Sequence, residues 1–363
     1  MNHKRIKYFD GLRGLCILSV VLYHAYSRWG NIETFNQSKF LSDFFSYGFY
    51  AVEIFFAISG YFIYQSLLRT KRFSNFGLKR YLRLAPAMYL GSLFIFITSF
   101  WIIERPLGLL YGTPSIVDLL PSLTFVQEGL LSRILGFEIL SLDGSFWSIY
   151  VEVRFYFIVA FLYYFLKDKK LNLLFILFIP WIFISIFDYN FDNNYQIITF
   201  LKPIFRSLVV KHYGWFLMGI FASKYKLKPN LKNLKYLFFV IFLAILSTGF
   251  KDLGNLLAST ISAFLFISPI FIRFLRSILS LKIFLFFGYI SYPLYIIHQN
   301  FVTGLAIKIH SSYVNLFGFI YPLLPILIAI LFSYLITKLE PYIKIFLEDK
   351  IKRIYTNLSS ISI

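Results

Sequence analysis

Residues 48–68 read GFYAVEIFFAISGYFIYQSLL. The stretch contains one charged side chain, Glu53, and the basic residues Arg69, Lys71 and Arg72 follow it closely. An apolar run of about 20 residues is long enough to cross the hydrocarbon core of a bilayer as a helix. The stretch therefore predicts a membrane-spanning helix that is followed by a basic loop.

Comparable runs recur from one end of the chain to the other. Hydrophobic residues make up 58% of the 363 residues, whereas soluble domains are about 45–50% apolar. The predicted fold is an all-α, polytopic integral membrane bundle of about ten helices. It forms one domain over residues 1–345, and a short basic tail follows at 346–363. We expect the spans near residues 11–28, 48–68, 84–103, 146–166, 172–188, 203–223, 233–250, 254–275, 283–304 and 319–339.

The charges between these runs predict the orientation. Lys and Arg cluster before the first run and after every even-numbered one, whereas the intervening loops hold most of the acidic residues. The positive-inside rule therefore predicts that both termini are cytoplasmic. It also places 104–145, the longest outside segment, as a partly folded cap with a short interfacial helix. The net charge of +19 is spread over these loops, and without a groove-reading motif it does not indicate nucleic-acid binding.

The sequence also argues against several classes of site. Arg13 lies inside the first run and no small-residue cleavage motif follows, so we expect a retained helix and not a signal peptide. Cys16 is the sole cysteine, which excludes an intrachain disulfide and a thiolate metal cluster. No His, Cys and carboxylate set has metal-ligand spacing, so no metal site is predicted. The chain also lacks a P-loop, a dinucleotide fingerprint and a Gly-x-Ser-x-Gly elbow.

Ionisable residues inside a spanning helix are costly and therefore mark candidate sites. Arg13 and His24 are eleven positions apart, about three helical turns, so they share a face at roughly 16 Å along the axis. With a cytoplasmic N-terminus, His24 falls in the outer half, and a long ligand could reach from Arg13 to His24. Taken alone, the two residues fit better with a structural alternative, in which the arginine snorkels and the histidine bonds to a neighbouring helix.

Two further groups have competing interpretations. In the second run, Glu53 needs a cationic or donor partner, which Arg13 or Arg154 could supply. Ser59 and Gly60 allow close approach of a backbone or a thin ligand, although plain helix packing explains them equally well.

Arg80 and Arg83 are three residues apart and project to one side of a helix. Their planar guanidinium groups suit the phosphates of a nucleotide. The positive-inside bias alone accounts for the outlying lysines of the 69–83 cluster.

Polar residues also gather in the fourth and ninth runs. Trp147, Ser148 and Glu152 open the fourth run at its predicted outer end. In the ninth, Tyr292, Tyr295 and His298 follow at three-residue steps. Aromatic stripes of this kind more often serve packing, and a lone histidine usually makes a structural bond.

Five blocks in this order resemble the acyltransferase-3 family of membrane acyltransferases. Each block alone is a weak signal, whereas five in order over residues 9–298 are specific. They are FDGLRG at 9–14 with VLYHA at 21–25, EIFFAISGY at 53–61, RYLRLAP at 80–86, WS at 147–148 with Glu152 and FY at 155–156, and SYPLYIIH at 291–298.

The resemblance implies ten helices, an acyl-CoA donor that is often acetyl-CoA, and a hydroxyl acceptor on a surface glycan or its lipid-linked precursor. It implies no permanently bound cofactor, and we expect a multi-pass protein of the bacterial inner membrane. It also makes His24 the catalytic histidine and Arg13, Arg80 and Arg83 required charged positions.

From these arguments we assign roles to fourteen residues. His24 would act as general base or as the site of an acyl-histidine, and Glu152 would orient the acceptor or stabilise the imidazolium. Donor binding is assigned to Arg13, Ser59, Gly60, Tyr61, Arg80 and Arg83, and acceptor or structural polar roles to Glu53, Trp147, Ser148, Tyr292, Tyr295 and His298.

The chain departs from the family pattern at two places. Val153 and Arg154 replace a second acid followed by Gln, and Trp215 occupies a region where an acid is common; both departures bear on acceptor recognition. The chain also ends soon after the tenth run, so no extracytoplasmic esterase-like domain is expected.

The alternative function is a transporter or flippase. A matched inverted repeat with broken helices would favour that function, and no such repeat is evident in the sequence.

Overall fold

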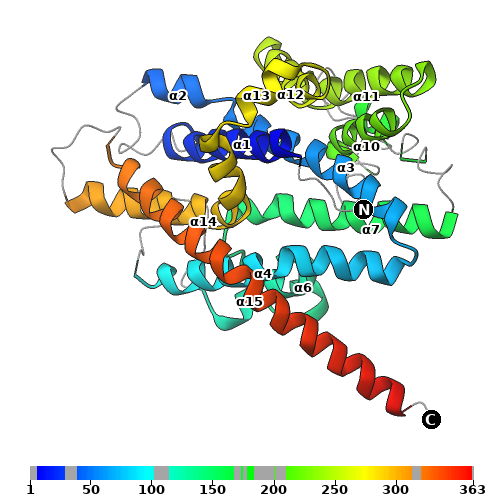
Figure 1. Cartoon of the computed structure of the whole chain (residues 1–363). Helices are drawn as coiled ribbons and strands as arrows, with labels where there is room; N and C mark the ends of the chain where they lie inside the picture. Colours follow the sequence, from blue (N-terminus) through cyan, green and yellow to red (C-terminus); the bar gives the residue numbers. More distant parts are fainter. Residues whose placement is uncertain are drawn as a thin grey trace. The chain divides into compact units, whose positions relative to one another are not determined.

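A computed structural model of the chain describes residues 6–28, 39–101, 114–166, 173–174, 178–183, 200, 210–312 and 320–361. Over these ranges the ordered elements are helices and no strand occurs (Figure 1). The all-α prediction is therefore confirmed for the described part of the chain.

The helices of the described ranges differ widely in length. Their bounds are α1 Lys7–Tyr26, α2 Lys39–Phe45, η1 Gly48–Tyr50, α3 Ala51–Arg69, α4 Phe73–Ser99, η2 Ile116–Leu119, α5 Leu120–Thr124, α6 Glu128–Leu135, η3 Gly144–Phe146, α7 Trp147–Leu166, η5 Val210–His212, α10 Tyr213–Leu227, α11 Leu231–Gly249, α12 Leu253–Phe271, α13 Arg273–Leu279, α14 Lys282–Ser312 and α15 Leu323–Ile361.

Several of these helices are long and apolar enough to cross a membrane. Among the described residues there are six such segments, or seven if the bent pair α13–α14 forms one span. With that pair included, these segments overlap seven of the predicted runs, although α4 begins at Phe73, eleven residues before the predicted run 84–103. The protein is a multi-pass membrane protein. The six are Lys39–Arg69, Phe73–Ser99, Gly144–Leu166, Leu231–Gly249, Leu253–Phe271 and Leu323–Ile354.

The other three predicted spans have different outcomes. The first forms α1, which is helical but less apolar than the six because it contains Asp10, Arg13 and His24. The fifth, at 172–188, lies largely outside the described residues. The sixth includes undescribed residues at 203–209 and continues as η5 and the 15-residue helix α10. The count of ten spans and the membrane side of each terminus therefore stay predictions.

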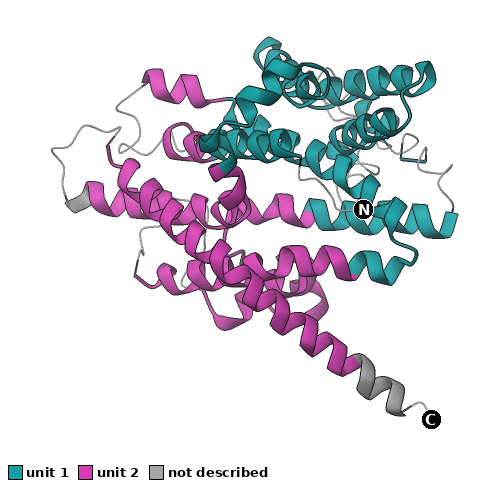
Figure 2. Cartoon of the chain, in the orientation of Figure 1, with its two compact units in different colours: residues 1–20, 47–77, 151–285 teal, residues 21–46, 78–150, 286–363 magenta. Residues whose placement is uncertain are grey.

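The chain divides into two compact units, each assembled from three separate stretches (Figure 2). Unit 1 comprises Met1–Val20, Tyr47–Gly77 and Val151–Leu285, and unit 2 comprises Val21–Ser46, Leu78–Tyr150 and Phe286–Ile363.

In unit 1, α10 packs against α3 and α11, and α12 packs against α11. Glycines bring the backbones of α3 and α10 together. A Cβ atom on Gly60 would lie 2.1 Å from the carbonyl oxygen of Phe216, and one on Gly219 would lie 1.9 Å from that of Ala57. Small residues permit this close packing of helices in lipid, so the packing role considered for Gly60 is present in the structure.

In unit 2, α4 packs against α14 and α15. A Cβ atom on Gly91 would lie 2.5 Å from Cγ2 of Ile296. The ring of Phe94 lies 5.0 Å from that of Phe301 and 4.7 Å from that of Phe332. These contacts join segments that are far apart in the sequence, and they place α14 and α15 beside α4.

The described part of the predicted cap also belongs to unit 2. It contains η2, α5 and α6, and residues 102–113 lie outside the described residues. Ser115 and Asp118 form a capping box at the start of η2, which satisfies backbone N–H groups that a helix start leaves open. The Leu140 N–H donates to Oδ1 of Asp118 at 2.7 Å, so the same carboxylate also holds the end of this segment.

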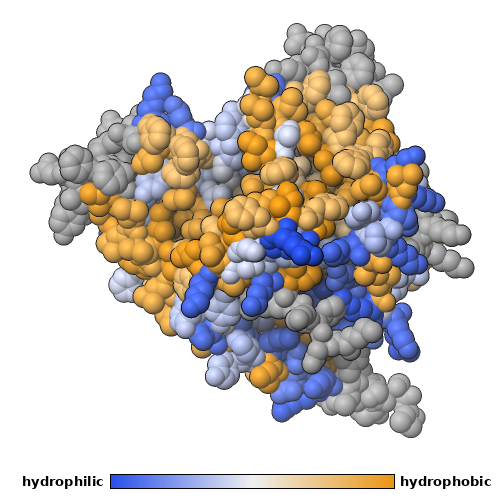
Figure 3. Space-filling view, turned by 45° about the horizontal axis from the view of Figure 1, so that its top comes forward, coloured by the Kyte–Doolittle hydropathy of each residue, from blue (hydrophilic) through white to orange (hydrophobic). Residues whose placement is uncertain are grey.

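Large apolar side chains cover much of the described surface, as the orange areas of Figure 3 show. Exposed apolar surface on this scale is expected where helices face lipid. Exposed aromatic and aliphatic residues on α7, α11 and α12 include Phe157, Phe161, Phe165, Phe238, Phe242, Leu257, Ile261 and Phe264.

The predicted tail at 346–363 is helical over its described residues, because residues 346–361 continue α15.

Candidate active site

Two histidines of unit 2, one on α1 and one on α14, are in contact. Nδ1 of His24, near the end of α1, is 3.2 Å from Nε2 of His298 in α14. The two ring centroids are 4.8 Å apart and the rings are nearly perpendicular. His298 is only 1% exposed, whereas His24 is half-buried. The structure thus brings together two of the predicted residues that are 274 positions apart.

The hydrogen bonds of the pair determine which nitrogens carry protons. Nδ1 of His298 is 2.8 Å from the carbonyl oxygen of Tyr295. A carbonyl only accepts, so this nitrogen carries the hydrogen, and in a neutral ring Nε2 is then the acceptor. His24 must therefore donate through Nδ1, and its lone pair is on Nε2. That atom is the basic nitrogen of the half-buried ring.

Ser148 and Tyr295, both predicted site residues, contact each other beside the histidine pair. Their side-chain oxygens are 2.7 Å apart. Oγ of Ser145 donates to the same Tyr295 carbonyl that binds His298, at 3.2 Å. The start of α7 is therefore bonded to the turn of α14 that orients His298.

Trp147 and Tyr292 lie near these residues in the chain but have different surroundings. Trp147 is 43% exposed at the first turn of α7. The Tyr292 hydroxyl donates to the Leu84 carbonyl at 3.3 Å, which links α14 to α4. A role for either residue in acceptor binding stays a prediction.

Asp143 is a component of this region that the sequence analysis missed. Its carboxylate is fully buried and accepts the backbone N–H groups of Ser145 at 2.8 Å and Asn300 at 2.9 Å. The Asn300 amide donates to the Leu142 carbonyl at 2.9 Å. Burial raises the pKa of Asp143 from 3.8 to about 6. Its position before η3 is a recognisable N-cap signal, but nothing local points to Asn300.

A second polar cluster lies within unit 1 and contains Glu152. Ser59 donates to Oε1 of Glu152 at 2.6 Å, and the Tyr156 hydroxyl donates to the same oxygen. The oxygens of Ser59 and Tyr156 are 2.9 Å apart. Both hydroxyl residues are buried, whereas Glu152 is half-buried. Two donors on one oxygen fix the orientation of this carboxylate.

Glu53 does not have the arginine partner that was considered for it. Its Oε1 is 2.8 Å from Nδ1 of His212, and both residues are 7% exposed. Neither Arg13 nor Arg154 fills this place, because η5 carries His212 to the start of α3. Arg13 instead pairs with Asp10 one turn earlier, at 3.2 Å. Glu53 thus has a partner of the expected cationic or donor kind, but that partner is His212, which the sequence analysis did not name, and neither of the two arginines.

The remaining donor-binding candidates lie in two places. Tyr61 in unit 1 is 2% exposed, and its ring centroid lies 4.7 Å from that of Phe9. In unit 2, Arg80 is half-buried on α4, whereas Arg83 is exposed and lines a cavity of about 540 Å³. The two arginines, predicted to act as a pair, therefore have different surroundings. Donor binding by these residues stays a prediction.

Metal ligands are not gathered in the ranges that the structure describes. There, no group of three or more His, Cys, Asp or Glu residues is placed to hold a metal ion. The polar groups gathered in unit 2 are the imidazoles of His24 and His298, nearby hydroxyls and the Asp143 carboxylate. Side chains of these kinds carry out acid–base catalysis.

Comparison with known proteins agrees with a site of this kind. A family model described as an acyltransferase domain matches residues 6–338. The chain belongs to the acyltransferase-3 family. The acyltransferase domain covers nearly the whole chain, including all of the predicted site residues.

Three relatives of the acyltransferase-3 chain have O-acetyltransferase names. An O-acetyl transferase of Shigella phage Sf6 is 29% identical over 229 residues, which cover 62% of this chain and 65% of the phage protein. The peptidoglycan O-acetyltransferase OatA of Listeria monocytogenes is 29% identical over 181 residues, or 47% of this chain and 26% of OatA.

The protein YrhL of Bacillus subtilis, whose name assigns it provisionally to the peptidoglycan O-acetyltransferases, is 32% identical over 168 residues. That match covers 43% of this chain and 23% of YrhL. The chain thus spans about a quarter of the two peptidoglycan-named relatives and just under two thirds of the phage protein. No solved structure matches the acyltransferase-3 chain.

Proposed function

We propose that the protein is a membrane O-acyltransferase of the bacterial inner membrane. It takes an acyl group, in the first instance acetyl, from cytoplasmic acyl-CoA and transfers it to a hydroxyl of a cell-surface glycan or its lipid-linked precursor. Family membership and the O-acetyltransferase names of the three relatives support the reaction class. The loop charges support an arrangement with both termini in the cytoplasm.

The oriented His24 is the observation that carries the proposal. A sugar hydroxyl is a poor nucleophile until its proton is removed, and an imidazole is a suitable base near neutral pH. Nε2 of His24 accepts the hydroxyl proton while the hydroxyl oxygen attacks the thioester carbonyl. The carbon–sulfur bond then breaks, and the CoA thiolate recovers the proton from the imidazolium. The products are the sugar ester and free CoA, so atoms and charge balance.

His298 supports this step by fixing the ring of His24. Its own orientation comes from the Tyr295 carbonyl, and its Nε2 accepts the hydrogen on Nδ1 of His24. The positive charge that develops on His24 strengthens this hydrogen bond, because charge-assisted bonds are about twice as strong as neutral ones. Glu152, held by Ser59 and Tyr156, is assigned to the acceptor hydroxyl.

The acyl-CoA donor is assigned to arginines of α1 and α4 and to residues of α3. The guanidinium groups of Arg80 and Arg83 suit the CoA phosphates, and Arg13, Ser59, Gly60 and Tyr61 are assigned to the pantetheine arm and acyl group. The donor is a substrate in this scheme, and no permanently bound cofactor is needed.

Reconstitution of the purified protein in liposomes tests the function. Acetyl-CoA is supplied on one side and a candidate glycan acceptor on the other, and the products are analysed by mass spectrometry. We expect free CoA and an O-acetylated glycan in equal amounts. Movement of either substrate across the bilayer without ester formation would instead support the transporter alternative. A strain without the protein should correspondingly lose O-acetyl groups from its glycans.

Reporter fusions test the arrangement of the loops. Fusions after Leu358 and within 71–79 should report the cytoplasm, and fusions within 108–140 should report the outside. A cytoplasmic signal from 108–140 would contradict the outward acceptor site.

A further inference from the structure

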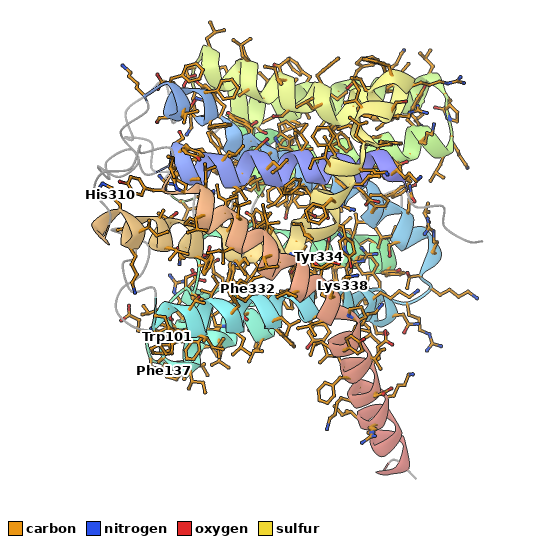
Figure 4. All side chains as sticks on the ribbon, turned by 60° about the vertical axis from the view of Figure 1, so that its left-hand side comes forward. Trp101, Phe137, His310, Phe332, Tyr334 and Lys338 are labelled. Carbon is orange, nitrogen blue, oxygen red and sulfur yellow. The ribbon has the colours of Figure 1, made fainter. Side chains whose placement is uncertain are left out.

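The cavity beside Arg83 lies entirely within unit 2, between the beginning of α4 and the later part of α15. Figure 4 labels Tyr334 and Lys338 on α15, and the α15 residues that line the cavity come after these two along the helix. On each helix the charged lining residues are spaced by four, so they share a face. The cavity is lined by Lys79, Leu82, Arg83 and Pro86 of α4 and by Glu340, Pro341, Lys344 and Glu348 of α15.

The lining combines three cations with two carboxylates. Lys79, Arg83 and Lys344 provide the positive charges, and Glu340 and Glu348 provide the acceptors. Carboxylates oppose the binding of a bare anion, whereas a nucleotide carries both phosphates and the N–H and O–H donors that carboxylates bind. The volume of about 540 Å³ lies within the range of about 300–1,000 Å³ that is typical of ligand pockets.

The helix backbone adds a further acceptor. Pro86 lies inside α4 and has no N–H, so it cannot donate the helical hydrogen bond to the carbonyl of Leu82, four residues earlier. Leu82 itself lines the cavity. A donor group on a ligand, such as an amino or hydroxyl group of a nucleoside, can use this carbonyl.

Lys344 is available to exchange partners. Its ammonium lies 3.9 Å from the Glu348 carboxylate, and both side chains are substantially exposed. Exposed ion pairs at this separation are weak, so a phosphate can displace Glu348. The two residues then have opposite effects on a phosphate ligand: Lys344 attracts it, and Glu348 repels it and competes for Lys344.

We propose that this cavity binds the phosphate-bearing nucleotide end of the acyl donor, with Lys79 and Lys344 sharing the phosphates with Arg83. Glu340 accepts hydrogen bonds from the nucleoside. The inference rests on the proposed function, because it takes the donor to be an acyl-CoA. It makes the later part of α15 half of the donor site, and it gives Lys79 a role beyond the positive-inside bias.

Binding measurements in nanodiscs of phosphatidylcholine test this assignment. The ligands are acetyl-CoA, its analogue without the 3′-phosphate, and acetyl-pantetheine, which lacks the nucleotide. We expect Lys344→Gln to weaken acetyl-CoA binding about tenfold, the loss of one charge-assisted hydrogen bond. Glu348→Gln should strengthen binding, because it releases Lys344. Lys338→Gln is the matched control, since Lys338 lies six residues earlier on α15 with its ammonium over the Tyr334 ring, and it should have no effect.

The ligand series separates the nucleotide end from the rest of the donor. Acetyl-pantetheine should bind the wild type, Lys344→Gln and Glu348→Gln equally. If Lys344→Gln and Glu348→Gln bind acetyl-CoA like the wild type, the assignment of the cavity is wrong even though the enzyme still uses acyl-CoA. If the wild type neither binds nor uses acyl-CoA, the proposed function itself fails.

Anionic lipid is the competing source of phosphate. Nanodiscs that contain phosphatidylglycerol should lower acetyl-CoA affinity only modestly and equally in the wild type and Lys344→Gln. If Lys344→Gln instead loses lipid binding and keeps acetyl-CoA binding, the cavity serves a lipid headgroup and the inference is overturned.

Discussion

Each of the two units contains a histidine that is hydrogen-bonded to another ionisable side chain. The two pairs differ in the partner of the histidine and in their exposure. In unit 1, His212 and Glu53 are both 7% exposed and joined at 2.8 Å. In unit 2, the buried His298 is bonded to His24, which is half-buried. One pair couples an imidazole to a carboxylate that is closed off from a ligand. The other couples two imidazoles and leaves the more accessible ring with its lone pair on Nε2.

Under the proposed function, histidine serves structure in unit 1 and chemistry in unit 2. His212 gives a partner to one oxygen of the Glu53 carboxylate, and a buried carboxylate without any partner would be costly. His298 fixes the tautomer of a second ring, His24, to which the proposed function assigns the chemistry. We therefore expect changes in unit 1 to act on stability and changes at His24 to act on the rate of transfer.

The largest expected effect is that of His24→Gln. Glutamine keeps hydrogen-bonding groups but offers no useful base, so the transfer rate should fall by about 10²–10⁴. Folding and acyl-CoA binding should be unchanged in the purified, reconstituted protein. His310→Gln is the control. His310 lies near the end of α14 (Figure 4), and its ring centroid is 4.8 Å from that of Tyr321. A His24→Gln enzyme that works near the wild-type rate would end the distinction between the two pairs.

Glu53→Ala should have the largest effect on stability. It leaves His212 buried without its carboxylate, and breaking a buried pair typically costs about 3–5 kcal/mol. The melting temperature in detergent should fall, while the rate per folded molecule is unchanged. Glu53→Gln should restore part of the stability, because an amide can still hydrogen-bond to an imidazole. A specific loss of rate without loss of stability would assign chemistry to unit 1 instead.

Asp143 provides a pH test of the network around the unit 2 pair. Its pKa is raised from 3.8 to about 6 by burial, so the folded state holds the proton more tightly than the unfolded state. The stabilisation is fully present below about pH 4 and is lost as the pH rises through about 6, a change of about 3 kcal/mol. Asp143→Asn should abolish this contribution to the pH dependence of the melting temperature, whereas Ser141→Ala should retain it. An identical pH dependence in Asp143→Asn and the wild type would disprove the assignment.

His298 should have a smaller effect on rate than His24, because it acts through that residue. His298→Leu removes the acceptor for Nδ1 of His24, and losing a hydrogen bond to a developing charge costs about 1.5–3 kcal/mol. The transfer rate should therefore fall about tenfold to a hundredfold. His298→Gln can donate to the Tyr295 carbonyl and accept from His24, so it should recover much of the rate. Equal rates in His298→Gln and His298→Leu would indicate a packing role only.

Tyr295→Phe should have the smallest effect of the series. It removes the hydroxyl that contacts Ser148 but keeps the backbone carbonyl that orients His298. The expected cost is about 1 kcal/mol of stability, as for one neutral hydrogen bond, with little change in rate. A loss of rate as large as that of His298→Leu would show that the hydroxyl, and not the carbonyl, maintains the histidine pair.

Local pattern was enough to predict the helices and the family. Seven apolar runs became long helical segments because spanning a membrane is a requirement on length and hydropathy, which are properties of continuous sequence. His24, Glu152 and His298 could be proposed because charged and polar residues are rare within such runs. The helix that continues through 346–361 was described only as a tail, because basic residues obscured its continuity with the apolar run before it.

Which polar groups meet was decided by the tertiary structure alone. His24 with His298, Glu53 with His212, and Asp143 with Asn300 join positions more than 150 residues apart, and no local periodicity encodes such pairs. The cavity on α4 and α15 likewise depends on packing between distant helices. Apolar content and charge bias sum along a chain and can be read from it, whereas a hydrogen bond depends on the distance and direction between two particular atoms, which only the packed helices define.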